Sequence, residues 1–122
     1  MRARFERPKN PDPRILQGID ALREEEEYVV FEVSVGHGKS ALFRVEFTEG
    51  GLRQSALFDS RVFTVTSHRL PPTWRYFQSD TGSLSLCPES WNQIGFWESY
   101  YDHDPRAIEV YETERQAILS SS

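Results

Sequence analysis

Apolar and polar residues alternate through the middle of this 122-residue chain. Every second residue from Val29 to Val35 is apolar, and residues 41–47 repeat the pattern with Arg44 and Glu46 between the apolar positions. A period of two indicates β-strands with one buried face. The glycines of the link 36–39 permit a tight turn, so the two segments predict an antiparallel hairpin.

Further segments favour strands because they are rich in β-branched and aromatic residues and are bounded by turn residues. These segments are residues 52–58, 62–67, 73–78 and 83–87. No helical segment separates them, which argues against a doubly wound parallel sheet. Together with the hairpin they predict an antiparallel meander of five to six strands.

Helical spacing occurs at both ends of the chain. From Pro13, apolar residues at 15, 16, 19 and 22 predict a short helix that ends near the acidic run Glu24–Glu27, which we interpret as a solvated turn. A C-terminal helix is expected from Pro88, with apolar positions at 91, 94, 97 and 101. Asp104-Pro105 predicts the start of a second helix, because the carboxylate caps free N–H groups.

Strands followed by helices are typical of an α+β fold in which the helices cover one face of the sheet. The length suits one domain. We expect a basic, proline-containing irregular arm at residues 1–13, a single domain at 14–119 and a tail at 120–122. The single cysteine excludes an internal disulfide, and no apolar run suits a membrane span or a secretory signal, so a cytoplasmic location is expected.

The formal net charge of −5 is unevenly distributed. Residues 1–14 carry a net charge of +3, and the rest of the chain therefore carries −8. An acidic body repels nucleic-acid phosphates and attracts basic proteins. Aromatic residues beside Arg69 and Arg75 are the best nucleic-acid candidates, but the surrounding acidity favours a protein partner.

Catalytic motifs are weak. The GHGK sequence around His37 only partly resembles a phosphate loop, and a strand rather than a helix follows it. Cys87 would need His68 or His103 beside it to act as a nucleophile. Residues 102–104 place three possible metal ligands in a row, where they cannot converge easily on one ion. We therefore expect no enzyme activity, no cofactor and no metal.

The segment Glu89–Glu114 combines two tryptophans, a phenylalanine and three tyrosines with seven acidic residues. Tryptophan and tyrosine are enriched at the centres of protein interfaces, and carboxylates around them suit a basic partner. The alternative interpretation is that all the rings pack onto the sheet. As contact residues we predict the following six: Trp97, Tyr101, Asp102, Asp104, Glu109 and Glu112.

The run from Gly95 to Ala107, followed by Tyr111-Glu112, resembles the C-terminal part of a family of small uncharacterised bacterial α+β proteins. More loosely, residues 72–118 resemble small acidic immunity proteins that neutralise bacterial toxins. The resemblance implies a cytoplasmic protein that inhibits a partner by covering it, and it assigns no residue a role.

Three hypotheses follow. The first is a non-enzymatic, immunity- or antitoxin-like inhibitor that binds a basic toxin or effector domain through the acidic aromatic surface. The second is a small enzyme or ligand-binding domain with a pocket between sheet and helices, involving His68, Cys87 and His103. The third is a structural subunit of a larger assembly that docks through the basic arm.

Overall fold

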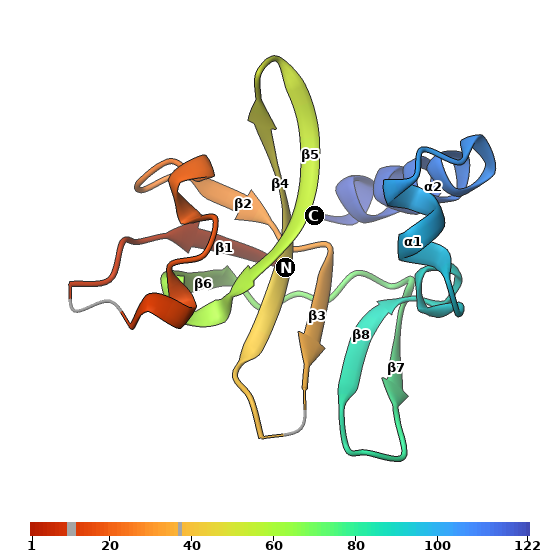
Figure 1. Ribbon diagram of the computed structural model, residues 1–122, viewed down its shortest axis with the longest axis horizontal. Helices are drawn as coiled ribbons and strands as arrows, with labels where there is room; N and C mark the ends of the chain where they lie inside the picture. Colours follow the sequence, from red (N-terminus) through yellow and green to blue (C-terminus); the bar gives the residue numbers. More distant parts are fainter. Residues whose placement is uncertain (10–11, 37) are drawn as a thin grey trace.

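A computed structural model describes residues 1–9, 12–36 and 38–122 and has the expected α+β fold (Figure 1). The described strands form two antiparallel sheets, one in the order β2-β1-β6 and one in the order β5-β4-β3-β8-β7. The strands are β1 (Arg2–Phe5), β2 (Glu27–Val29), β3 (Glu32–Val35), β4 (Ala41–Glu49), β5 (Leu52–Asp59), β6 (Phe63–Ser67), β7 (Trp74–Gln78) and β8 (Leu84–Pro88).

The predicted antiparallel pairing is confirmed for β3 and β4, in a register that places Glu32 opposite Arg44. The predicted first strand is shorter than expected, because Val29 belongs to β2 of the smaller sheet. The meander is wrong in its order. In a meander, β6 would pair with its sequence neighbours β5 and β7. Instead β6 belongs to the smaller sheet, where it pairs with β1, and β8 pairs with β3 in the larger sheet. The central strand of the larger sheet is therefore β3, and β6 pairs with the N-terminal strand β1.

The beginning of the chain is a strand and not an irregular arm. Residues 2–5 form β1, the central strand of the smaller sheet, and both Ala3 and Phe5 are completely buried. Arg2 and Arg4 alternate with them on the outer face. The alternation R-A-R-F is the period-two pattern in four residues, and the prolines that follow it begin only after the strand has ended.

The helix predicted from Pro13 is also wrong. Two 3-10 turns take its place, η1 (Pro13–Ile15) and η2 (Ile19–Ala21). Between them Gly18 has a φ of +78°, which a continuing α-helix does not allow. The apolar residues were nevertheless assigned correctly to the core, because Ile15, Ile19 and Leu22 are buried.

At the C-terminus, the helix expected from Pro88 is divided. A 3-10 turn, η4 (Glu89–Asn92), precedes helix α1 (Phe96–Tyr101), and Gly95 separates them with a φ of +79°. Ile94, predicted to lie on the inner stripe, is fully exposed. Helix α2 (Pro105–Ser121) begins where it was predicted, because the Asp104 carboxylate accepts the backbone N–H of Arg106 at 2.9 Å.

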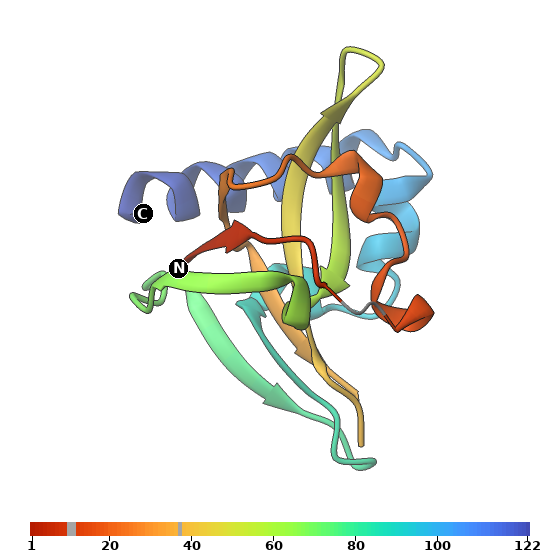
Figure 2. The ribbon, with the colours of Figure 1, turned by 90° about the vertical axis from the view of Figure 1, so that its left-hand side faces the viewer.

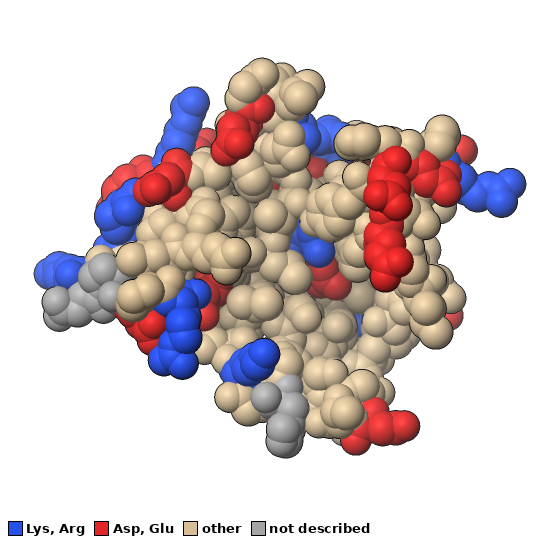
Figure 3. All heavy atoms as spheres, viewed as in Figure 1, with Lys and Arg blue, Asp and Glu red and all other residues tan. Residues whose placement is uncertain are grey.

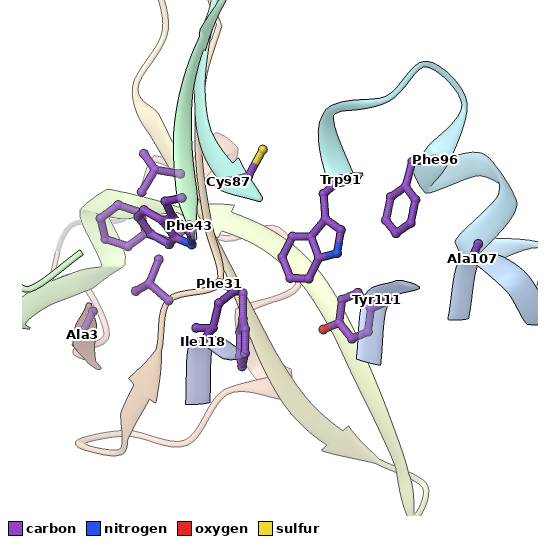
Figure 4. Packing of buried hydrophobic residues seen from close by; sticks show 12 residues of the cluster. Ala3, Phe31, Phe43, Cys87, Trp91, Phe96, Ala107, Tyr111 and Ile118 are labelled. Carbon is purple, nitrogen blue, oxygen red and sulfur yellow. The ribbon is translucent and has the colours of Figure 1, made fainter. Parts of the chain in front are cut away.

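The larger sheet lies between the helices and the smaller sheet, as Figures 1 and 2 show from two sides. Toward the helices it presents residues such as Arg44 and Glu46, which bond Tyr101 and Tyr111. On its other face, Val45 and Phe58 pack in one cluster with Phe5 of β1. A second cluster extends from the sheet to α2 and contains Phe31, Trp91 and Ile118 (Figure 4).

Candidate partner-binding surface

Most rings of the aromatic segment belong to the core. Trp91 and Tyr111 are buried and stack with ring centroids 5.0 Å apart (Figure 4). Trp97 and Tyr100 lie edge-on to each other at 5.5 Å and are partly buried. The rings therefore join η4, α1 and α2 to one another, and each close pair adds about 0.5–1.5 kcal/mol to the stabilisation from burial.

Trp97 is partly covered by a cation from the sheet. The guanidinium carbon of Arg44 lies 3.6 Å from the centroid of the Trp97 ring, and Arg44 Nε donates to Glu32 Oε1 at 2.8 Å. Only 3% of the Arg44 side chain is exposed. Burial by itself would lower the pKa of Arg44, but Glu32 and Tyr101 outweigh that effect and raise it.

Tyr101 fastens α1 to the sheet. Its hydroxyl donates to the backbone carbonyl of Ser55 at 2.9 Å and accepts from Arg44 Nη1 at 2.8 Å. The residue as a whole is nevertheless 51% exposed. Tyr101 can therefore contact a partner with one side of its ring while its hydroxyl is held in place.

Glu112 belongs to an ion-pair network between α2 and the sheet. It pairs with Arg53 and, at 3.8 Å, with Arg115, whose Nε also donates to Glu46 Oε1 at 2.8 Å. Glu46 additionally accepts a hydrogen bond from the Tyr111 hydroxyl. Burial and the nearby Glu46 carboxylate both raise the pKa of Tyr111, so its hydroxyl remains a donor. The charge of Glu112 is thus largely compensated within the protein.

Asp102, Asp104 and Glu109, the remaining three predicted contact residues, are exposed. None of them lies within ion-pair distance of a lysine or arginine among the residues that the structure describes. Glu98, which sequence analysis did not select, is exposed in the same way on α1. Figure 3 shows acidic side chains gathered over α1 and the link that leads to α2.

The structure therefore divides the six predicted residues into two groups. Trp97 and Glu112 are engaged by Arg44, Arg53 and Arg115, whereas the three acids remain open to solvent and Tyr101 is shared between the two roles. Sequence reasoning missed Arg44. One signal was available, because Glu32 and Arg44 lie on the two strands of the predicted hairpin, and opposite charges at paired positions attract; the structure places them directly opposite each other.

The groups proposed for a catalytic pocket occupy different environments. His68 and His103 are exposed, while Cys87 is completely buried on β8. Burial, reinforced by the Glu32 carboxylate, raises the pKa of Cys87 to about 12, so the thiol is neutral near pH 7 and is a poor nucleophile. His37 of the GHGK sequence lies outside the described residues.

The described residues contain neither a metal-binding cluster nor a membrane-spanning helix. Within residues 1–9, 12–36 and 38–122, no three His, Cys, Asp or Glu side chains are grouped closely enough to hold a metal ion. Neither described helix is both long and apolar enough to cross a membrane.

Comparisons of the chain with protein families, curated proteins and solved structures found no match. A functional hypothesis therefore depends on the arrangement of side chains at this surface.

Proposed function

We propose that this protein is a non-enzymatic binding module that recognises a basic protein partner, as an immunity or antitoxin-like inhibitor does. The binding surface consists of the exposed carboxylates of α1, the α1–α2 link and the first turns of α2. Tyr101, at the edge of this surface, supplies an aromatic contact. The partner is a toxin or effector domain whose own functional surface is basic, and binding covers that surface.

The observation that supports the proposal is that these acids form no ion pair with a lysine or arginine side chain among the described residues. Glu98, Asp102, Asp104 and Glu109 have no charged lysine or arginine nitrogen within 4.0 Å of their carboxylates in the described part of the chain. Unpaired carboxylates concentrated on one surface produce a negative potential, and such a potential accelerates association with a basic protein at low salt.

A basic partner gains more from open carboxylates than from paired ones. An acid that already bonds an arginine of its own protein must lose that interaction before it can bind another cation. Exposed and unpaired acids have no such interaction to lose, so they suit fast, salt-sensitive association. Steering by charge also explains why an immunity-like protein need not present a large apolar patch.

The test is recovery of a partner from an extract of the source cell at low salt, using immobilised protein. We expect a protein of basic composition to bind the wild type and to elute with salt. The variant Asp102→Lys/Glu109→Lys should recover much less of it. We leave Asp104 unchanged in this test, because it caps α2 and its loss would alter the fold.

The matched control is Glu49→Lys/Asp80→Lys, which changes the net charge equally. Glu49 and Asp80 are exposed acids at the β4–β5 and β7–β8 turns, at opposite ends of the molecule and away from α1 (Figure 1). The purified partner should also lose its activity when it is mixed with the wild type. Equal recovery by both charge variants, or binding without inhibition, would contradict the proposal.

A further inference from the structure

The smaller sheet covers only part of the larger one. Its strands lie over successive residues of β4, since Phe5 of β1 packs in one cluster with Val45, and Phe63 of β6 lies beside Phe43 with ring centroids 5.8 Å apart. The next residue of β4 on this face is Ala41, and no described strand follows β6 over it. In Figure 2 the ends of β3, β4, β7 and β8 continue below β6, where no strand of the smaller sheet lies over them.

The uncovered residues form an apolar row across the larger sheet. Ala41 of β4 lies opposite Val35 of β3, which lies opposite Leu84 of β8, so the three side chains share one face. It is the face that carries Phe43, and all three residues are partly exposed. Tyr76 lies on the same face of β7 and is 57% exposed. A further strand beside β6 would bury this apolar row.

The free edge of β6 runs beside the row. In the described chain β6 pairs with β1 alone, and on that side the Val62 carbonyl accepts the N–H of Glu6 at 2.9 Å. Backbone groups of alternate residues point to opposite edges of an antiparallel strand, so those of Phe63 and Val65 point away from β1. The Phe63 N–H donates to the Ser60 carbonyl. The Phe63 carbonyl and both backbone groups of Val65 bond no other described strand.

The edge strands of the larger sheet are blocked, in contrast to β6. On β5 the Ser55 carbonyl accepts the hydroxyl of Tyr101 from α1 at 2.9 Å. On β7 the Trp74 N–H donates to the Pro71 carbonyl at 3.1 Å, and Arg75 Nη1 donates to the Trp74 carbonyl at 3.0 Å. Proteins block edge strands in such ways because free backbone groups pair with other chains. The edge of β6 is therefore the one most open to pairing among the longer edge strands of the described chain.

The residues that flank β6 are basic. Arg61 precedes it and pairs with Asp59 at 2.9 Å. Arg69 follows it, is exposed and forms no ion pair among the described residues. An acidic residue on an added strand would therefore find an unpaired cation at the C-terminal end of β6.

A second copy of this chain does not suit the free edge. The inner side chains of β6, such as Phe63, already pack on the larger sheet of their own copy. Two copies that paired through β6 with the same faces aligned would bring two larger sheets into one space. With one copy turned over, the polar face of β6, which carries Thr64 and Thr66, would lie on the apolar row. The edge therefore suits a separate extended segment.

We infer that the free edge of β6 binds an extended segment of a partner protein, which adds to the smaller sheet as its fourth strand. The segment runs antiparallel to β6, so that one inward residue exchanges both backbone hydrogen bonds with Val65. Every second residue of the segment is apolar and lies on the apolar row, and an acidic residue lies near Arg69. The site is on the opposite face of the larger sheet from α1, so it is separate from the acidic surface.

The probe is the peptide acetyl-Glu-Val-Thr-Val-Thr-Val-Glu-amide, titrated into the full chain and followed by backbone amide NMR and hydrogen exchange. We expect saturable shifts at residues 63–67, Val35 and Leu84, and slower exchange of the Val65 amide in the complex. A peptide of the same composition in the order Glu-Val-Val-Val-Thr-Thr-Glu should bind at least tenfold more weakly, because its valines cannot all face the apolar row.

N-methylation of the peptide separates strand addition from simple apolar contact. In the antiparallel arrangement the N–H of the central valine donates to the Val65 carbonyl, whereas the threonine N–H groups point away from β6. A methyl group on the nitrogen of the central valine should weaken binding at least tenfold, and one on the first threonine should weaken it much less. The protein is unchanged in this comparison, so a folding defect cannot produce the result.

The charge contact is tested with Arg69→Gln, which keeps the backbone carbonyl that accepts the N-terminal amine. The variant should bind the peptide about threefold more weakly at low salt, as expected for one exposed ion pair. Replacing the first glutamate of the peptide by glutamine should have the same effect, and the two losses should not add. The control Arg106→Gln should bind as the wild type does.

Three results would overturn the inference: equal affinity for the two N-methylated peptides, equal affinity for the reordered peptide, or no added protection of the Val65 amide. Dimers of the free chain that protect Val65 would assign the edge to a second copy instead. The proposed function can fail separately. Asp102→Lys/Glu109→Lys should lose the basic partner and still bind the peptide with wild-type affinity, and loss of the peptide as well would contradict a separate site.

Discussion

Acidic residues are used in opposite ways at the two ends of this protein. Near the N-terminus they pair with arginines that come from the strand β1 and the residues after it. On η4, α1 and α2 most of them face solvent without a partner among the described residues. Both regions are rich in acids, yet in one the acids are paired within the protein and in the other most are available for binding.

The N-terminal acids form a layer over the smaller sheet. Glu27 pairs with Arg2 at 3.1 Å, Glu25 with Arg4 at 3.8 Å and Glu24 with Arg7 at 3.9 Å. Glu26, the remaining member of the run, accepts from the Tyr28 hydroxyl at 3.0 Å. The run therefore neutralises the arginines of β1 and of the residues that follow it.

The difference teaches that a local concentration of acid does not by itself indicate a binding surface. Three of the four acids in the longest acidic run pair with arginines of the same chain, while most of the acids that are scattered one or two at a time along α1 and α2 remain open. Whether an acid is paired or open depends on whether a strand that carries arginines lies beside it. That relation depends on which strands pair, and β1 pairs with β2 across more than twenty residues of sequence.

The first prediction concerns the most deeply buried paired acid. Arg44→Met would leave the Glu32 carboxylate buried without its cation and remove the bond to Tyr101. Breaking a buried pair in this way costs about 3–5 kcal/mol. We expect the free energy of unfolding, measured by urea denaturation, to fall by that amount.

Adding Glu32→Leu to Arg44→Met gives the control. The double variant removes the uncompensated charge, so it should be more stable than the single variant. If the single variant is as stable as the wild type, Glu32 is adequately solvated without Arg44. The distinction between neutralised and open acids would then fail at its clearest example.

The second prediction concerns Asp104, an open acid that also has a structural role. Asp104→Ala removes the carboxylate that accepts the Arg106 N–H and should lower the free energy of unfolding by about 0.5–2 kcal/mol. Asp104→Asn keeps the capping oxygen and loses only the charge. It should retain most of the stability and still slow association with a basic partner.

If Asp104→Asn is destabilised as much as Asp104→Ala, the charge near the start of α2 matters more than the cap. The negative carboxylate would then act mainly on the helix dipole. Either result assigns the stability contribution of this residue, and urea denaturation of both variants distinguishes the two.

The strands were predictable because their signal is local. The alternation in residues 29–35 and 41–47 predicts the pairing of β3 with β4, which the structure confirms. It does not predict that Val29 belongs to β2 of the smaller sheet, or that Glu32 and Arg44 on the opposite face are buried as well. The start of α2 was predictable for the same reason, since a capping acid and a proline are adjacent in the sequence. Local signals failed at Gly18 and Gly95, where a left-handed backbone interrupts an apolar spacing that suits a helix.

The arrangement of the sheets and the use of each site residue could not be predicted in this way. Whether β8 pairs with β3 or with β6 depends on packing between distant segments. Glu112 and Asp102 both lie in the acidic C-terminal segment, but Arg53 of β5 pairs with Glu112 and not with Asp102. A sequence pattern identifies side chains that can bind a partner, and the tertiary structure decides which of them are already occupied.

The third prediction uses pH to compare the paired acids with the rest of the chain. Hydrogen bonds from Thr66 and Arg2 lower the pKa of Glu27, and hydrogen bonds from Arg4 and Thr64 lower that of Glu6. The unfolded chain, with an ordinary glutamate pKa near 4.5, therefore binds protons first on acidification. The contribution of Glu6 and Glu27 to stability is complete above the ordinary glutamate pKa. It is lost as the pH falls through the lower pKa values that these two residues have in the folded protein.

Because both glutamates are exposed, each contribution is small, and the useful measurement is a difference between variants. The unfolding temperature of the wild type should remain constant from pH 7 to about pH 5 and fall at lower pH. Arg4→Gln removes the main partner of Glu6, so the unfolding temperature of this variant should fall less steeply with decreasing pH. The control Arg106→Gln removes an arginine that is in none of the described ion pairs, and its unfolding temperature should fall as steeply as that of the wild type. An identical slope for Arg4→Gln would mean that these surface pairs do not stabilise the smaller sheet, and its stability would then depend on the buried side chains of Ala3 and Phe5 alone.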